Sequence, residues 1–337
     1  FMTILKICSF ELLHTYDKLF YKIFEIIEEN IEDNSNDSIK AYYFALASVI
    51  SIKNKNLSEA ENLYDKALLT VKNLKNVQDE FHVYYLISRF LAPILEFNQL
   101  DFFNKKTFEL SQKTAYFTKG YYCLFDQIIF KINLGYNLEE IHNELQKIDL
   151  FIDIIDKDSV YTFFKVLDNF VEFLIKKTDN IITIDENKFL DVIFYKEIEL
   201  ISEGLKYFYY IKGLKFFFSQ DFSKAKIIFE TLYNFLIELP YTDPLIINYF
   251  YFYTLTLSEL SYKNKLKEKK IIRLENEIEK FKLILDNPNS IFYTKYLLIS
   301  AELKRIKGSN YRIISDIYER AFEMSKNRKL NLDVAII

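Results

Sequence analysis

Apolar residues recur at spacings of three and four along most of the chain, in stretches of helical length that short polar segments separate. This periodicity is typical of amphipathic α-helices that turn one face toward a core. The separating segments are Asp33–Asp37, Asn54–Asn56, Asn98–Gln99, Gly135–Asn137, Ser219–Asp221, Asp243–Pro244, Asn287–Pro288 and Gly308–Asn310. The pattern therefore predicts a succession of helices joined by short turns.

Several of these segments carry signals for the start of a helix. In Asp243-Pro244 and in Asn287-Pro288, an oxygen acceptor precedes a proline, which suits the first helical position because its missing N–H costs nothing there. The asparagine-to-glutamate spacing of a capping box occurs at Asn56 with Glu59 and at Asn137 with Glu140. We expect a helix to begin at each of these four places.

Weak internal repeats appear in the second helix of successive predicted pairs. The segment 56–67 has the small, aromatic, small spacing with which tetratricopeptide repeats pack two helices closely. The segment 221–229 repeats most of it, after Tyr209, Gly213 and Phe216 at first-helix spacing, and Tyr318 with Ala321 gives a third partial copy. We therefore predict an all-α fold, a tetratricopeptide-like (TPR-like) α-α superhelix in which antiparallel helix pairs form a solenoid with irregular repeats.

The segment Thr178–Asn187 mixes β-branched residues with turn formers and predicts an irregular loop. We place the boundary between two lobes there, with an N-terminal helical-repeat lobe at 1–178, the loop at 179–188 and a C-terminal helical-repeat lobe at 189–337.

The charged run Lys263–Lys282 has apolar residues at heptad spacing over only two heptads. It favours one long amphipathic helix over a coiled coil.

Composition removes several classes of function. The 337 residues include five glycines and four prolines, and none of the glycines has another within reach, so a glycine-rich phosphate loop is excluded. A net charge of −4 does not provide the overall positive charge that is typical of nucleic-acid-binding proteins. Two cysteines fit a reducing compartment and support neither a disulfide framework nor a four-ligand zinc site.

No membrane insertion and no secretion signal are expected. The longest uncharged run, Pro244–Ser258, is shorter than a bilayer requires and reads as a buried helix. The start of the chain carries Lys6 and Glu11 and lacks a small-residue cleavage site. Because Met2 is not the first residue, we expect a segment of a longer, cytoplasmic protein.

Catalytic, cofactor-binding and metal-binding residues are not predicted. Cys123 lies in an apolar surrounding that favours an inert core thiol. The histidines His14, His82 and His142 have no sequence-adjacent partner and favour helix-surface or satisfied interior positions. The carboxylates that come nearest to metal-ligand spacing fit a solvated acidic helix end better; they are Asp149, Asp153, Asp156 and Asp158.

Runs of consecutive aromatic residues are the most conspicuous feature, at 207–210, 216–218 and 249–253. Core packing is the favoured interpretation, because consecutive aromatics point around a helix toward neighbours on both sides. The alternative is a groove that grips a peptide or a partner helix. The residues we assign to such a partner groove are Tyr209, Phe216, Tyr249, Tyr253 and Tyr296.

The segments 287–306 and 317–321 resemble the helical region of large bacterial trifunctional signalling proteins, and the segments 207–229 and 248–257 resemble the preceding helices of that region. Those proteins join a serine/threonine protein kinase, an AAA-type ATPase, a helical repeat region, a GAF domain and often a sensor histidine kinase. A histidine common in the family is Thr294 here, and the family's tryptophan near the end of the lysine-rich helix is Phe281.

The resemblance implies a non-catalytic interaction and spacer region with no cofactor of its own, which couples binding of a partner or ligand to neighbouring kinase and ATPase domains. Its partners would be the adjoining domains of the same chain and a protein or peptide. The alternative is a TPR-like peptide-sensing receptor domain of a transcriptional regulator. A third possibility, an enzyme in its own right, would need a pocket with convergent polar groups.

Overall fold

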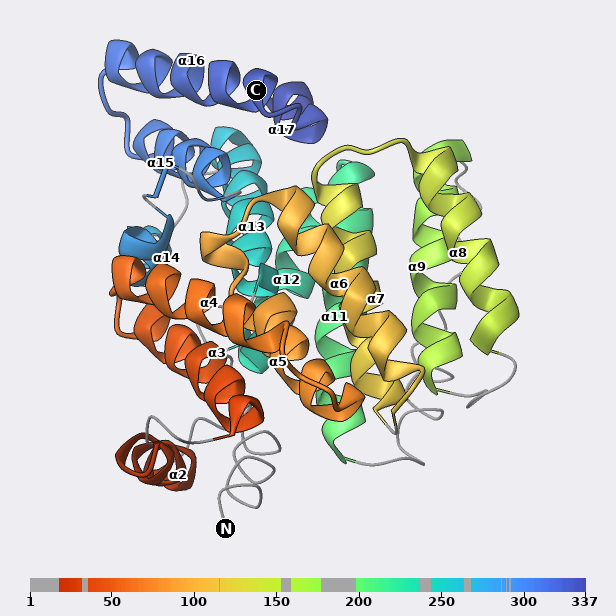
Figure 1. Cartoon of the computed structure of the whole chain (residues 1–337). Helices are drawn as coiled ribbons and strands as arrows, with labels where there is room; N and C mark the ends of the chain where they lie inside the picture. The colour runs from red at the N-terminus through yellow and green to blue at the C-terminus, as the bar shows by residue number, and fades with distance from the viewer. Residues whose placement is uncertain are drawn as a thin grey trace. The chain divides into compact units, whose positions relative to one another are not determined.

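The computed structural model describes residues 18–31, 36–114, 116–152, 159–176, 198–236, 244–263, 268–285, 287–288, 290 and 292–337. All regular structure in these residues is helical (Figure 1). The chain forms two compact units, of which unit 1 comprises Phe1–Gln127, Glu238–Ile246 and Phe281–Tyr293, and unit 2 comprises Ile128–Ile237, Ile247–Lys280 and Thr294–Ile337. The predicted all-α class is therefore confirmed for the described residues.

The helices follow one another with short connections in the first half of the chain. They are α2 (Lys18–Glu29), α3 (Asp37–Lys53), α4 (Leu57–Val71), α5 (Val77–Phe90), the 3-10 turn η1 (Ala92–Ile94), α6 (Phe97–Ser111), α7 (Phe117–Asn133), α8 (Leu138–Ile152) and α9 (Ser159–Lys176). The second half contains α11 (Ile198–Phe218), α12 (Phe222–Leu236), α13 (Pro244–Lys263), α14 (Glu268–Leu285), α15 (Tyr293–Ile306), α16 (Tyr311–Asn327) and α17 (Asn331–Ile336). The predicted loop at 179–188 lies outside the described residues, so the two-lobe division at that loop stays a prediction.

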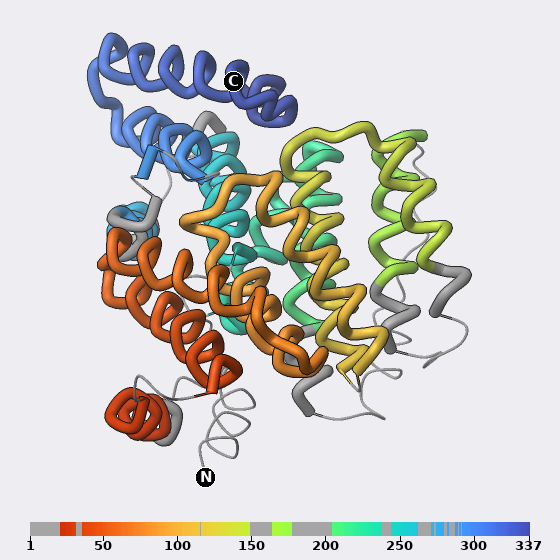
Figure 2. The backbone as a smooth tube through the Cα atoms, viewed as in Figure 1, coloured from red at the N-terminus to blue at the C-terminus, as the bar shows by residue number. Residues whose placement is uncertain are grey.

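Sequential helices pack as pairs inside each unit. In unit 1, α3 packs on α4 and α5 on α6, and α3 also contacts α5 of the next pair. In unit 2, α8 packs on α9 and α11 on α12, and α11 also contacts α9. Figures 1 and 2 show α3 beside α4, and α8 beside α9, with each partner running antiparallel to the other.

The small residues of the predicted repeat pattern are buried on α4, α12 and α16. Ala60, Ala67, Ala225 and Ala321 are all fully buried. Between α3 and α4, the Ser48 hydroxyl donates to the Ala60 carbonyl at 2.7 Å. A larger side chain at Ala60 would hold α3 and α4 apart, so the small-residue pattern marks this contact correctly.

Five helices in the described residues end in the same type of turn. Each has a residue with a φ of about +58 to +74° two positions beyond the helix, and the N–H groups of that residue and of the next one bond back to carbonyls near the end of the helix. Glycine occupies this position at Gly135 and Gly308, whereas Lys55, Gln220 and Lys329 occupy it elsewhere. The chain therefore makes sharp helix stops with very few glycines.

The capping predictions have mixed outcomes. Asn56 accepts a hydrogen bond from the Glu59 N–H, and Asn137 accepts from the N–H groups of Glu139 and Glu140, as expected. Helix α13 begins at Pro244, also as expected, although Asp243 lies outside the described residues.

Two predicted boundaries are wrong. Helix α15 begins at Tyr293 and not at Pro288, because the Asn287 carbonyl accepts from the Ser290 N–H and forms a turn ahead of the helix. Asn98-Gln99 lies within the first turn of α6. The true break is the 3-10 turn that contains Pro93, and Gln99 completes a capping box with Glu96.

A buried ion pair joins the C-terminal helix α17 to the middle of unit 2. The Lys295 ammonium, on α15, lies 2.9 Å from the Asp333 carboxylate, and the two side chains are 2% and 0% exposed. The other oxygen of Asp333 accepts from the Thr294 hydroxyl at 3.1 Å. The Tyr251 hydroxyl also donates to Asp333, at 3.2 Å, and Lys295 lies over the Tyr251 ring, 4.2 Å from its centroid.

The same network reaches the end of α7. Lys295 donates to the Asn133 carbonyl at 3.3 Å, and the amide oxygen of Asn133 accepts from the Tyr210 hydroxyl at 3.1 Å. Burial raises the pKa of the Tyr210 phenol, and burial together with the nearby Asp333 charge raises the pKa of Tyr251. Helices α7, α11, α13, α15 and α17 therefore meet at one polar cluster.

We predict that Gly213→Ala destabilises the protein. A Cβ at this position would lie 2.5–2.9 Å from ring atoms of Phe229, whose side chain is fully buried between α11 and α12. Overpacking should exceed the gain in helix propensity and lower the free energy of unfolding by about 1–2 kcal/mol. Urea unfolding followed by circular dichroism measures this. The same glycine substitution should cost less in a Phe229→Leu background, and equal costs in both backgrounds would contradict the contact.

We predict that the Lys295 and Asp333 substitutions are strongly non-additive. Lys295→Met and Asp333→Leu should each lower the free energy of unfolding by about 3–5 kcal/mol, because each leaves a buried charge without its partner. The double variant should lose much less than the sum of the two, as measured by urea unfolding. The exposed Lys224→Met serves as the matched control and should change the free energy by less than about 1 kcal/mol. Additive losses would contradict a coupled pair.

Candidate partner-binding pocket

The five residues assigned to a partner groove lie on α11, α13 and α15, and two of them line the cavity described below. Tyr249 and Tyr253 line the same cavity on α13. Tyr209 is half-buried and stacks on Phe235, with ring centroids 5.6 Å apart. Phe216 lies below the Lys224 ammonium, and Tyr296 is half-buried on α15; neither these two residues nor Tyr209 lines the cavity.

The cavity has a volume of about 310 Å³ and lies within unit 2, between α12, α13 and α14. We call it the aromatic pocket. Its lining residues are Glu230, Tyr233 and Asn234 from α12, Tyr249, Phe250 and Tyr253 from α13, and Leu274 and Glu277 from α14. Their spacings of three and four place each group on one face of its helix.

Three tyrosine rings form a stacked column along one wall of the pocket. Tyr249 stacks on Tyr233 at 5.9 Å and 29°, and on Tyr253 at 5.4 Å and 15°. Phe229, fully buried behind this wall, meets Tyr249 and Tyr253 edge-on, with centroids 6.1 and 6.4 Å away. The Phe229 ring is also the one that packs against Gly213. Contact between α11 and α12 therefore supports the position of the tyrosine column.

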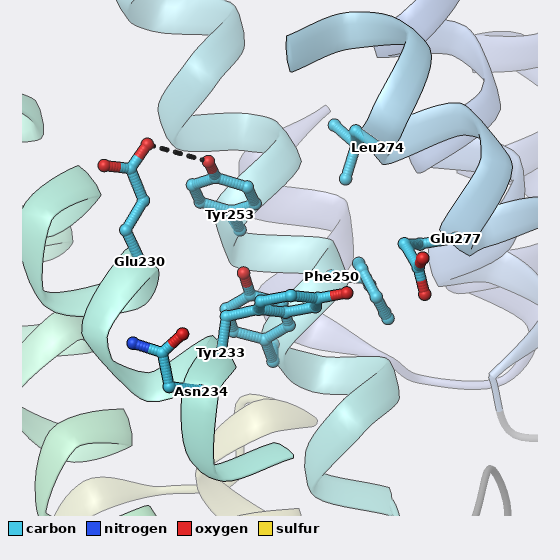
Figure 3. A pocket seen from close by; sticks show the side chains of 8 residues that line it. Glu230, Tyr233, Asn234, Phe250, Tyr253, Leu274 and Glu277 are labelled. Carbon is cyan, nitrogen blue, oxygen red and sulfur yellow. Dashed lines mark hydrogen bonds between the residues drawn. The ribbon is translucent and has the colours of Figure 1, made fainter. Parts of the chain in front are cut away.

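Carboxylates flank this aromatic surface on opposite sides. Figure 3 shows Glu230 on one side and Glu277 on the other, with the rings of Tyr233 and Phe250 between them. The Tyr253 hydroxyl donates to Glu230 at 3.2 Å, the contact drawn as a dashed line. The eight lining residues include neither lysine nor arginine. The lining is therefore mainly aromatic, with two carboxylate side chains among its polar residues.

Sequence reasoning named only part of this site. Phe250 belongs to one of the aromatic runs, and Leu274 and Glu277 lie in the predicted amphipathic helix. Glu230, Tyr233 and Asn234 carry no signal that the sequence analysis identified. The three residues on α12 have i, i+3, i+4 spacing, which places them on one face, but an ordinary solvated face gives the same signal. Only the packing of α12, α13 and α14 brings them around one cavity.

The remaining candidates for chemistry are engaged in structural contacts. His142 Nδ1 lies 2.7 Å from the Asp168 carboxylate, whose second oxygen accepts from Gln146 at 2.9 Å. This contact joins α8 to α9. His82 is buried in an aromatic surrounding that includes Phe81 and Tyr116, so it occupies an interior position.

The predicted acidic helix end can be followed only in part. Asp149 belongs to α8, whereas Asp153, Asp156, Asp158 and His14 lie outside the described residues. Within the described part of the chain, no group of three or more histidine, cysteine or carboxylate side chains is arranged to hold a metal ion. In the same residues, none of the helices combines the length and apolar character that a membrane crossing requires.

Cys123 is a core thiol, as predicted. Its side chain is fully buried on α7, with the Ser88 hydroxyl 3.4 Å from the sulfur. Burial raises the pKa of the thiol to about 12, against smaller lowering effects of the Arg89 charge and the Ser88 hydrogen bond. The nucleophilic thiolate is therefore strongly disfavoured at neutral pH.

We predict that Cys123 in the folded protein does not react with Ellman's reagent at pH 8. The Cys8→Ser variant leaves this single thiol and should release the chromophore only after denaturant is added, because both burial and the raised pKa protect the sulfur. The reaction of the unfolded variant provides the control for a competent thiol. Rapid, stoichiometric reaction without denaturant would contradict the core assignment.

Comparison with protein-family models finds no family that matches the sequence, and comparison with curated proteins finds no similar protein. What the chain does is therefore inferred from its helical architecture and from the aromatic pocket.

Proposed function

We propose that this chain is a non-catalytic helical-repeat interaction region of a multidomain signal-transduction protein. In this proposal, paired helices form a TPR-like solenoid that binds a protein or peptide and transmits the binding to neighbouring catalytic domains of the kinase, ATPase and histidine kinase type. The parent protein acts in the cytoplasm, and the segment itself needs no cofactor. The sequence resemblance to the helical region of large bacterial trifunctional signalling proteins motivates this assignment.

The aromatic pocket is the observation that carries the proposal. Its tyrosine column offers a large, pre-positioned contact area, and Tyr side chains lose little conformational entropy when they bind a partner. A volume of about 310 Å³ fits an anchoring side chain rather than a folded domain. Stacked helix pairs commonly present such anchors on an extended surface.

The pocket also supplies a physical route for coupling. Its occupant would contact three helices at once, including α14 through Leu274 and Glu277. A neighbouring carboxylate on α14, Glu275, pairs with Lys307, just beyond α15, at 2.7 Å. An occupant that binds one arrangement of these helices more tightly shifts the population toward that arrangement. Domains attached to the segment would then sense the binding event.

A peptide-sensing receptor domain of a transcriptional regulator is the second candidate, and the same pocket favours it. The two candidates differ in the domains that accompany the segment. Kinase and P-loop motifs upstream with a GAF domain downstream would support the signalling region, whereas a helix-turn-helix domain in the same gene would support the receptor. Sequencing the gene on both sides of the segment distinguishes them.

We predict that peptides selected from a displayed random library against the 337-residue chain bind at the aromatic pocket. Asn234→Arg places a bulky side chain at an exposed position of the pocket lining, so it should weaken the selected peptides by at least about tenfold, as measured by isothermal titration calorimetry. Ile227→Arg, on the same helix at a position 61% exposed and outside the lining, is the matched control and should change the affinity less than about twofold.

Two results would contradict the proposal. If the selection yields no binding peptide, or if both arginine variants bind every selected peptide as well as the unmodified chain does, the pocket is not an interaction site. The coupling itself is tested in the intact parent protein, where Asn234→Arg should abolish the effect of a bound peptide on kinase or ATPase activity while the basal activity stays unchanged.

A further inference from the structure

We infer that the buried site around Lys295 is a carboxylate-binding site, which Asp333 of α17 occupies in cis and which an aspartate of a partner segment takes when α17 leaves. The site lies within unit 2 and shares no residue with the aromatic pocket. The inference therefore goes beyond the proposed function and is tested separately. It follows from the way α17 is held, from the chemistry of the site and from the contacts beside Asp333.

Helix α17 is held by a charged side chain and not by an apolar face. A helix that packs into a core normally buries an apolar stripe. In α17, the buried residue is Asp333. The apolar residues of this helix are partly or fully exposed; they are Leu332, Val334, Ala335 and Ile336. The position of α17 therefore depends chiefly on one carboxylate, as the binding of a short peptide depends on one anchor residue.

Three donors shape the site for a carboxylate. The Lys295 ammonium and the Tyr251 hydroxyl donate to one oxygen of Asp333, at 2.9 and 3.2 Å. The Thr294 hydroxyl donates to the other oxygen at 3.1 Å, and all three donor residues are at most 2% exposed. One ammonium balances one negative charge, so a phosphate group with a charge of about −1.5 to −2 would leave excess charge buried. The site therefore selects a carboxylate.

The donors belong to helices other than α17. Thr294 and Lys295 lie on α15, and Tyr251 lies on α13. Both helices also bury apolar side chains, such as Phe252 and Leu298, so their packing does not depend on α17 alone. When α17 leaves, the buried ammonium loses its partner, which is costly. This cost favours the entry of another carboxylate.

Contacts beside Asp333 indicate what kind of segment fits. The Asn331 side chain donates to the Gly135 carbonyl at 3.2 Å, and the Leu332 N–H donates to the Leu134 carbonyl at 3.5 Å. An added Cβ at Gly135 would lie 2.4 Å from the Leu332 nitrogen, so this glycine leaves room for a second backbone. These contacts use one asparagine side chain and one backbone N–H. The partner that fits is a short segment with asparagine two positions before an aspartate.

Hydrogen exchange in the unmodified 337-residue chain tests whether α17 leaves the site. The Val334 N–H bonds to the Leu330 carbonyl in α17. Without denaturant, it should exchange through a local opening at least about tenfold faster than the Tyr251 N–H in the middle of α13. If both amides exchange at the rate set by global unfolding, α17 is not displaceable and the inference is wrong.

A peptide supplied in trans tests the site itself. The probe is the fluorescein-labelled peptide Arg-Lys-Leu-Asn-Leu-Asp-Val-Ala-Ile-Ile, the sequence of residues 328–337. By fluorescence anisotropy, the Asp333→Ala chain should bind it at least about tenfold more tightly than the unmodified chain does, because Asp333 in cis competes at a high effective concentration. An analogue with asparagine in place of the aspartate should bind the Asp333→Ala chain at least about tenfold less tightly.

Variants of the cation locate the interaction. In the Asp333→Ala chain, adding Lys295→Met should abolish the preference for the aspartate peptide over its asparagine analogue. Lys224→Met removes an exposed ammonium in the same background, so it is the matched control and should keep the preference.

Three results with the peptides would overturn the inference. The first is equal binding of both peptides to the Asp333→Ala chain, and the second is a preference that survives Lys295→Met. The third is an Asp333→Ala chain that circular dichroism shows to be unfolded even at saturating peptide, because a carboxylate supplied in trans should restore the buried pair.

Discussion

The buried ion pair between Lys295 and Asp333 is the constraint around which unit 2 is organised. Removing two charges from water is costly, so such a pair is tolerated only when hydrogen bonds satisfy both groups. Here Thr294 and Tyr251 donate to the carboxylate, while the ammonium also reaches the Asn133 carbonyl and the face of Tyr251. The six-residue helix α17 would be too short to persist alone. Helix α17 is held in place because its Asp333 side chain binds to this cluster.

The connections between helices are adapted to the polar cluster and to the scarcity of glycine. The turn after α7 uses Gly135 at a positive φ, where an added Cβ would lie 2.4 Å from the backbone nitrogen of Leu332. Asn331 donates to the Gly135 carbonyl at 3.2 Å, so this turn and the start of α17 are in direct contact. Glycine is needed there for space as well as for conformation. At Lys55, Gln220 and Lys329, the chain accepts the cost of a side chain at positive φ.

Packing and the proposed binding site share residues. Phe229 fills the close approach of α12 to Gly213 on α11, and the same ring supports Tyr249 and Tyr253 in the pocket wall. A change at the α11–α12 contact should therefore alter the pocket as well as the stability. In the proposed function, this connection links the repeat pattern to the binding site, because Gly213 lets the two helices approach and so sets the position of the rings in the pocket wall. The two interpretations of the aromatic runs, core packing and a binding groove, are compatible at Tyr249. Its side chain is only 2% exposed and still lines the pocket.

The sequence by itself determined the helical class, the buried small residues and most of the helix stops, because periodicity, caps and helix-ending turns depend on neighbours a few positions away. It misjudged the starts of α6 and α15, where a 3-10 turn with Pro93 and a turn at Asn287 replaced the expected boundaries. Lys295 and Asp333 are 38 positions apart in the sequence, and Glu230 and Glu277 are 47 positions apart. No local pattern indicates that the members of either pair lie close together. Only the tertiary structure decided these associations, because burial and charge proximity depend on which helix faces meet, and those contacts join residues far apart in the chain.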